Sequence, residues 1–133
     1  MASLYKHRSV KSLISLTKGE GYGLPILEAA ASALPVIATN WSGHKDFLSH
    51  GKFIEIDYRL LEIHGSRVDN KIFMKGSKWA NPIEEDFKRK VAKFRSGSLI
   101  PKEWAISLSQ KIQEKYSIEA VKSQYDEVTK DLI

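Results

Sequence analysis

The chain contains no cysteine, and none of its apolar stretches is long. The absence of cysteine excludes disulfides and thiolate metal sites, and with them a secreted scaffold held together by disulfides. No apolar run approaches the roughly 20 residues that a membrane-spanning helix needs. The first residues also lack an apolar core of signal-peptide length. We therefore expect a cytoplasmic protein without a transmembrane segment.

The chain also lacks a dense basic segment. Its net charge is +5, but the lysines and arginines are scattered and interleaved with acidic residues, which is typical of a solvated surface. It contains no arginine-rich arm, aromatic-basic RNA motif or zinc finger, so the composition does not favour nucleic-acid binding. With 133 residues, 42% of them hydrophobic, the chain has the size and composition of one globular domain.

The order of apolar segments predicts an α/β fold. Short stretches rich in branched apolar residues at 10–16, 35–39 and 53–56 predict strands. Between the first two, the alanine-rich residues 25–34 predict a helix. Strand, loop, helix and strand in this order make a βαβ unit of a parallel sheet. We expect a partial Rossmann-like, three-layer domain with a small parallel sheet of three to four strands and C-terminal helices.

The second half of the chain is predicted to be mainly helical. Residues 44–50 indicate a short helix, and residues 57–78 an irregular excursion with a short strand at 71–74. Later helices are expected over about 83–94, over 102–115, where Trp104, Leu108 and Ile112 have helical spacing, and from the cap Ser117 to Leu132. Within a single domain of residues 1–133, the α/β part would span 1–95 and the closing helices 98–133.

The loop between the first strand and its helix is the expected place for chemistry. It holds Gly19, Gly21 and Gly23, a density that predicts close approach of a ligand or unusual backbone angles. Ligands of open α/β sheets bind at the carboxyl ends of strands, and a helix N-terminus there suits phosphate. Glu20 and Glu28 flank the helix start, and carboxylates accept sugar and ribose hydroxyls.

Two other interpretations fit the same residues. The glycines can serve only a tight turn, with both glutamates solvated, because short motifs often match by chance. Alternatively, the two glutamates can be the paired carboxylates of a glycosidase. The glycines and the helix that follows them favour phosphate binding over the glycosidase interpretation.

Residues 20–39 read EGYGLPILEAAASALPVIAT. This segment resembles the signature of the group 1 (family 4-like) glycosyltransferases of the GT-B fold, in which a glutamate, seven residues and a second glutamate precede Pro-Val-Ile. Residues 40–47 resemble the next donor-side loop of that family, residues 79–82 its Trp-Ala-x-Pro, and the closing helices its tail. The chain thus resembles the later part of the C-terminal, donor-binding domain, least closely over 57–78.

The resemblance implies roles for individual residues. Glu20 would face the donor sugar and stabilise positive charge at the reacting centre, a catalytic role by electrostatics. Glu28 would bind the ribose hydroxyls of the nucleotide. The other implied donor-binding residues are Gly21, Tyr22, Gly23, Leu24, Gly43 and His44. Family members bind their donor without a metal ion, so neither a cofactor nor a bound cation is expected.

The resemblance implies transfer of a hexose from a UDP- or GDP-linked sugar with retention of configuration. Only part of such an enzyme is matched, without its acceptor-binding domain or the early strands of its donor domain. We therefore expect the first strand or its neighbour to be an exposed sheet edge. We also expect the isolated chain to be inactive until completed by an N-terminal acceptor domain or in a homodimer. The alternative is a non-catalytic sugar-nucleotide-binding or assembly module.

Overall fold

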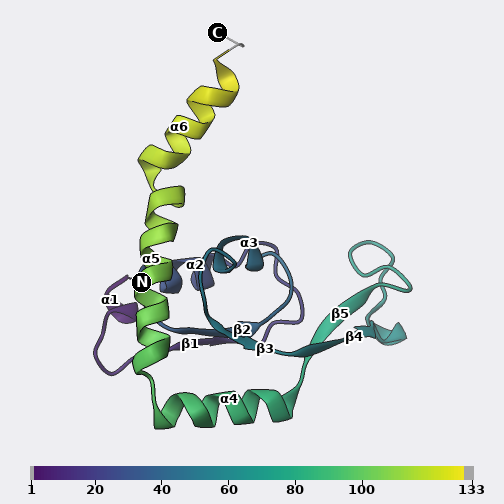
Figure 1. The fold of residues 1–133 in the computed structure, drawn as a ribbon. Coiled ribbons are helices and arrows are strands. Elements are labelled where there is room, and N and C mark those ends of the chain that lie inside the picture. The colour runs from purple at the N-terminus through teal and green to yellow at the C-terminus, as the bar shows by residue number, and fades with distance from the viewer. Residues whose placement is uncertain (1, 131–133) are drawn as a thin grey trace.

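A three-stranded parallel sheet lies at the centre of the fold (Figure 1). The computed structural model describes residues 2–130. The strands, in their order across the sheet, are β1 (Leu13–Ser15), β2 (Val36–Thr39) and β3 (Ile54–Ile56). Ile37 of β2 lies opposite Ile14 of β1 and opposite Ile54 of β3, and both pairs of strands are parallel. The predicted parallel sheet is confirmed, with three strands.

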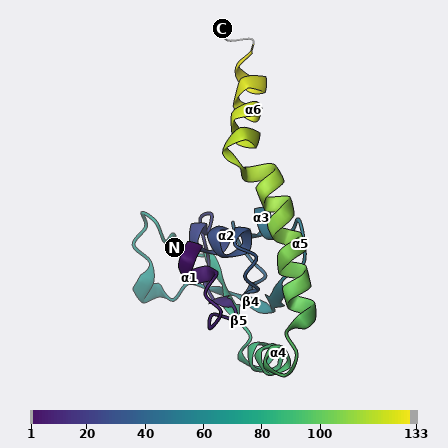
Figure 2. The same ribbon diagram turned by 90° about the vertical axis from the view of Figure 1, so that its left-hand side faces the viewer.

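Helices cover the sheet on both faces (Figures 1 and 2). The helices around it are α1 (Ala2–Tyr5), α2 (Leu24–Ala31), α3 (Lys45–Leu48), α4 (Glu84–Ser96) and α5 (Leu99–Tyr116). Val36 and Ala38 of β2 are buried with α2, α3 and α5, whereas Ile37, between them, is buried with Phe94 of α4. Successive residues of β2 thus face opposite layers. The architecture is therefore the predicted Rossmann-like arrangement of three layers.

The outer edge of β1 is only partly covered. Ile14 shares a sheet face with its neighbour Ile37, yet Ile14 is 46% exposed and Ile37 is fully buried, because α4 packs over β2 and β3. Leu16, just beyond the strand, is also exposed. Within residues 2–130, β1 pairs only with β2. The exposed edge predicted at the first strand is therefore present.

Residues 57–78 are not the irregular excursion that the sequence predicts. β4 (Tyr58–Glu62) pairs with β5 (Lys78–Pro82) in an antiparallel hairpin that projects from the body (Figure 1). The prediction of a strand at 71–74 is wrong, because those residues lie in the loop at the hairpin tip, after the 3-10 turn η1 (Gly65–Arg67). The alternation typical of a half-buried strand is missing, since adjacent Leu60 and Leu61 are both exposed.

A buried carboxylate joins the hairpin to α4. The Asp86 side chain accepts the N–H of Asp57 (2.9 Å) between β3 and β4, and it pairs with Lys90 (2.7 Å) and Arg89. Burial alone would raise the pKa of Asp86, but these hydrogen bonds and ion pairs hold it below its ordinary value. The charged form of Asp86 therefore holds the end of the sheet and the start of the hairpin together.

The last helix, α6 (Ile118–Thr129), extends away from the body (Figures 1 and 2). Ser117 caps it as predicted, since its Oγ accepts the N–H of Ala120 (3.1 Å). On α5, Leu108 and Ile112 are buried at the predicted helical spacing. The predicted helix end at Leu132 lies outside the described residues. Over residues 2–130, no helix has the length and apolar character to cross a membrane.

Candidate functional site

Two loops leave the carboxyl ends of β1 and β2 and are joined by hydrogen bonds. The first loop is residues 16–23, between β1 and α2, and the second loop is residues 40–44, between β2 and α3. Ser42, in the second loop, accepts the N–H of Glu20 at its Oγ (2.8 Å) and donates its hydroxyl to the Glu20 carbonyl (2.7 Å). The N–H of Gly43 donates to the same carbonyl (3.1 Å). Ser42 adopts a φ of 89°, a region that non-glycine residues seldom occupy. The second loop therefore fixes the backbone of Glu20 on both sides.

The contact between the loops leaves no room for a side chain at Gly43. A Cβ there would lie 1.8 Å from the carbonyl oxygen of Gly21 and 2.9 Å from that of Glu20. At Gly21, by contrast, an added Cβ would meet nothing within 4 Å. Gly43 was predicted as a donor-binding residue, which nothing in the fold tests. Its observed role is to let the two loops touch.

Gly23 turns the first loop into helix α2. It is the N-cap residue with φ 85° and ψ 51°, a left-handed conformation that glycine adopts without steric cost. Its carbonyl accepts the N–H groups of Ile26 (2.9 Å) and Leu27 (3.0 Å). Pro25, in the first turn, has no N–H to leave unpaired. The loop thus leads directly to a helix N-terminus, where the helix dipole favours an anion.

The two glutamates differ in their surroundings. Glu20 is half-buried, and its Cγ lies against the position that a side chain on Gly23 would take. Glu28 is exposed on α2, one turn after the helix begins. Within residues 2–130, neither carboxylate takes part in a hydrogen bond or an ion pair. Both are therefore free to accept hydroxyl groups from a ligand.

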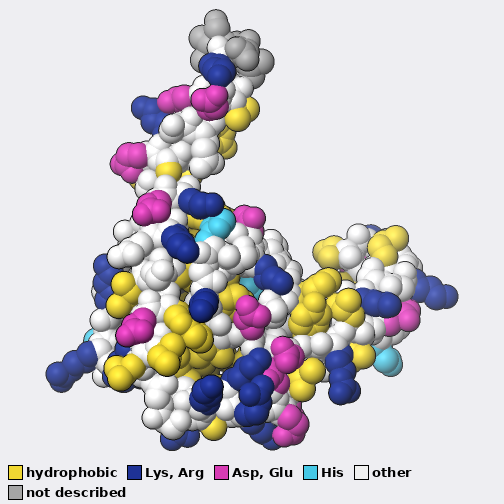
Figure 3. Space-filling view, in the orientation of Figure 1, with side chains coloured by type: hydrophobic (Ala, Val, Ile, Leu, Met, Phe, Trp, Pro, Cys, Tyr) yellow, Lys and Arg dark blue, Asp and Glu magenta, His cyan; other side chains and the backbone are white. Residues whose placement is uncertain are grey.

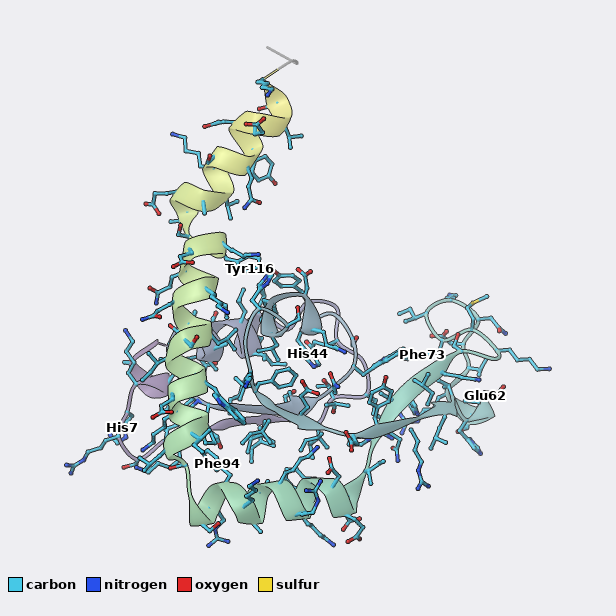
Figure 4. All side chains as sticks on the ribbon, viewed as in Figure 1. His7, His44, Glu62, Phe73, Phe94 and Tyr116 are labelled. Carbon is cyan, nitrogen blue, oxygen red and sulfur yellow. The ribbon has the colours of Figure 1, made fainter. Side chains whose placement is uncertain are left out.

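His44 is buried in the body of the fold rather than exposed at the surface (Figure 4). It is fully buried, and its Nε2 lies 2.7 Å from the carbonyl oxygen of Thr39 at the end of β2. The bond requires the tautomer with the proton on Nε2, which leaves Nδ1 as an acceptor. Its predicted contact with a donor is untested, whereas its observed contact ties the second loop to β2.

Buried polar atoms without a partner gather on the segments that leave these strands. They are the Oγ1 atoms of Thr17 and Thr39 and Nδ1 of His44, none of which has a hydrogen-bond partner among residues 2–130. Thr17 follows β1, and Thr39 ends β2. Unpaired buried polar groups cost stability. Their presence at the carboxyl edge of the sheet distinguishes this edge from the apolar core.

The hairpin base forms a further side of the site, which the sequence did not reveal. The N–H of Ala80 donates to the carbonyl of Lys18 (2.9 Å), and the Lys18 ammonium lies 4.8 Å from the Trp79 ring centroid. Trp41 of the second loop packs on Tyr58 of β4, with ring centroids 5.3 Å apart. The available signal is the Trp-Ala-Asn-Pro sequence at 79–82, which lies in strand β5.

Tyr22 and Leu24, both predicted to bind the donor, lie at the surface. Tyr22 is 37% exposed and packs on the buried Phe47 of α3, with ring centroids 5.4 Å apart. Leu24, the first residue of α2, is 60% exposed. The predicted residues Glu20 to Leu24 therefore form one continuous segment along the sheet edge, while Glu28 lies one helical turn further on.

A separate groove of about 430 Å³ lies between β3, α4 and α5. Its lining includes Phe53, Lys93 and Trp104, but neither Glu20 nor Glu28 and no residue of the two loops. The candidate site is thus an open sheet edge and not this groove. Among residues 2–130, no three His, Asp or Glu side chains lie close enough together to hold a metal ion.

Residues 1–62 match the family described as glycosyl transferases group 1. Searches of curated proteins and of solved structures gave no significant match. The resemblance of residues 79–82 and of the closing helices to the same family lies outside the matched segment and stays a prediction. The matched segment contains the whole parallel sheet, both loops, α2 and α3. Residues 1–62 of this chain, with both loops of the candidate site, are therefore similar in sequence to the group 1 glycosyltransferases.

Proposed function

We propose that the two loops bind the sugar donor of a glycosyltransferase, a hexose linked to UDP or GDP. The observation that carries the proposal is the set of hydrogen bonds between the second loop and the Glu20 backbone, here called the clamp. Ser42 and Gly43 hold its backbone beside the N-terminus of α2, while its carboxylate and that of Glu28 stay free. One edge of the sheet thus offers a place for an anion next to two acceptors of hydroxyl groups.

Each part of the donor is assigned to a part of this edge. The backbone groups of Gly21, Tyr22, Gly23 and Leu24 approach the sugar and the diphosphate, whose charge the α2 dipole attracts. Glu28 accepts the ribose hydroxyls. Glu20 accepts hydroxyls of the sugar ring. The match of residues 1–62 to the family and the exposure of Glu28 support this assignment.

The proposed reaction breaks the bond between the anomeric carbon and the diphosphate oxygen, and an acceptor hydroxyl forms the new bond with retention. The electron pair of the broken bond leaves on the nucleoside diphosphate, where the N-terminus of α2 stabilises it. The Glu20 carboxylate stabilises the positive charge that develops on the sugar. The hydroxyl proton leaves with the departing phosphate oxygen. We propose that residues 1–133 form the later part of a GT-B donor domain, completed by an acceptor domain or by a second copy.

Calorimetric titration of the chain with UDP- and GDP-hexoses tests the donor site. We expect saturable binding of one nucleotide class that EDTA does not change, and no transfer by the chain alone. Circular dichroism and cooperative unfolding serve as the control for folding. A folded chain that binds neither class of nucleotide sugar would contradict the proposal.

A second candidate function is a non-catalytic assembly module. The exposure of Ile14 and Leu16 beside the free edge of β1 supports it, because another chain can pair there. Sedimentation equilibrium with and without nucleotide sugar separates the candidates. A dimer that binds no nucleotide sugar favours assembly, and binding that never leads to transfer, even with an acceptor domain supplied, favours the non-catalytic module.

A further inference from the structure

The tip of the β4–β5 hairpin is a closed turn in which the N–H groups of residues 69–73 are paired. Oδ1 of Asp69 accepts the N–H groups of Lys71, Ile72 and Phe73, each at 2.9 Å. The Phe73 carbonyl in turn accepts the N–H groups of Asp69 and Asn70, both at 3.2 Å. A backbone with paired N–H groups enters a layer of low polarity at a smaller cost than one with free N–H groups.

This turn presents apolar side chains to solvent. Ile72 is 79% exposed and Met74 is 51% exposed. Phe73, between them, packs edge-on against Trp79 of β5, with ring centroids 6.2 Å apart. Figure 3 shows apolar side chains along this projection and at its tip, with lysine and arginine around them. Phe73 thus joins the tip to the hairpin, while Ile72 and Met74 have no comparable burial.

Positive charge surrounds the same apolar residues. Lys71 and Lys75 flank the three apolar positions directly. Over residues 58–82 the hairpin carries five basic residues and two acidic ones. One of the two acids is Asp69, whose charge faces the three N–H groups, and the hydrogen bond from Lys71 foremost lowers the pKa of its carboxyl. Apolar side chains bordered by lysines are the combination that binds an anionic membrane surface.

We propose that the hairpin tip docks on an anionic lipid bilayer. Ile72 and Met74 enter the boundary between headgroups and acyl chains, and Lys71 and Lys75 meet the anionic headgroups. The inference does not depend on the proposed donor site. The docked tip would be connected to the candidate site through β5, since the N–H of Ala80 donates to the carbonyl of Lys18, two residues before Glu20.

Helix α6 provides a comparison that favours lipid at the hairpin. It also exposes aliphatic side chains, with Ile118 at 83% and Val128 at 76%. Residues 118–129 of α6 include three acidic residues and one lysine, and Lys130, which follows the helix, is a second lysine. Exposed apolar surface without excess positive charge has no attraction for anionic headgroups. The hairpin tip combines both features, and α6 has only one.

Co-sedimentation of the full chain with vesicles tests the proposal. We expect binding to vesicles of phosphatidylcholine with phosphatidylglycerol, and much weaker binding to phosphatidylcholine alone. Ile72→Ser with Met74→Ser should lower the partition coefficient at least about tenfold. Each of Lys71→Gln and Lys75→Gln should lower it about fivefold. The matched control, Ile118→Ser with Val128→Ser, removes a more exposed apolar pair from α6 and should leave the partition coefficient unchanged.

A fluorescent probe locates the contact independently of affinity. Because the chain has no cysteine, Met74→Cys and Val128→Cys each accept a single environment-sensitive dye. Anionic vesicles should shift the dye emission to the blue at position 74 and not at position 128. Lipid docking at the tip is wrong if the folded wild-type chain does not bind anionic vesicles. It is also wrong if the α6 control lowers the partition coefficient as much as the tip variant does. The first result would indicate that the exposed apolar residues of the tip contact another protein instead of lipid.

Discussion

The loops of the candidate site and the hairpin tip are built from similar parts, but their hydrogen bonds reach different distances along the chain. Ser42 and Asp69 each accept backbone N–H with a side-chain oxygen, and a positive φ occurs at each place: Ser42 itself has φ 89°, and Asn70, which follows Asp69, has φ 54°. Ser42 bonds to Glu20, 22 residues away in the sequence. Asp69 bonds only to residues up to four positions further on.

This difference determines how far a disturbance spreads. The site loops connect β1, β2, α2 and α3, so a change there alters elements that carry the core. The hairpin tip connects only to its own strands, so a change there stays local. Segments that open independently of the global unfolding reaction have few contacts with the core. We therefore expect large effects on stability from the site loops and small ones from the tip.

The largest effect is expected for Gly43→Ala. The new Cβ would overlap the carbonyl oxygen of Gly21 at 1.8 Å, so one loop must move and release Glu20. We expect a loss of about 3 kcal/mol in the free energy of unfolding, at the upper end for overpacking, together with loss of nucleotide-sugar binding. Urea denaturation and calorimetry measure the two.

Gly19→Ala is the matched control for Gly43→Ala. A Cβ at Gly19 would meet nothing within 4 Å, and this glycine has no positive φ. We expect its free energy of unfolding to stay within about 0.5 kcal/mol of wild type, as for most surface substitutions. Equal losses in both variants would show that the loops are not locked together at Gly43.

The next effect is on binding and separates the two glutamates. Glu28→Ala should weaken the binding of every nucleotide sugar by about 1.5–3 kcal/mol, which is the contribution of a hydrogen bond to a charged group. The effect should be the same for all of them, because they all contain the ribose. Glu20→Ala should mainly reduce discrimination between sugars on the same nucleotide. Calorimetric titrations with two sugars on each base distinguish the roles. Identical behaviour of the two variants would contradict the assignment.

The sequence predicted the elements whose residues are dictated by local physics. Pro25 in the first helical turn, the alanines that follow and the apolar residues 35–39 indicated the βαβ unit, and β2 is indeed buried on both faces. Gly23 was expected in a loop of unusual backbone angles, and its φ of 85° confirms this. At these positions propensity, burial and backbone geometry all favour the same structure.

The hairpin and the burial of His44 were not predictable in the same way. Strands β4 and β5 pair along a projection, so neither shows the alternation that burial on one face produces. A histidine in a polar loop resembles a surface residue until the Thr39 carbonyl is brought within 2.7 Å of it. Both features depend on contacts between segments that only the fold brings together.

A smaller effect is expected for Ser42→Ala, which removes the hydroxyl and keeps the chain otherwise intact. Glu20 loses a partner for its N–H and one for its carbonyl, although Gly43 still donates to the carbonyl. We expect about 1–2 kcal/mol lower stability, because each hydrogen bond contributes about 1 kcal/mol, and weaker donor binding. Ser49→Ala, which removes only an exposed bond to Asp46, should change neither. A loss of stability without a loss of binding would separate the clamp from the donor site.

The smallest effect is expected for Asp69→Ala, which removes the acceptor of three N–H groups in the tip. Amide hydrogen exchange of Lys71, Ile72 and Phe73 should become faster, while the midpoint of urea unfolding stays unchanged. The control is Asp126→Ala on α6, which should also leave the unfolding midpoint unchanged. Acid should have the same local effect on the wild type. Because the pKa of Asp69 is lowered in the folded chain, the turn is fully stabilised above the ordinary pKa of aspartate. That stabilisation is lost as the pH falls through the lower, folded value. If Asp69→Ala instead shifted the unfolding midpoint, the tip would be coupled to the core, and the contrast with the site loops would fail.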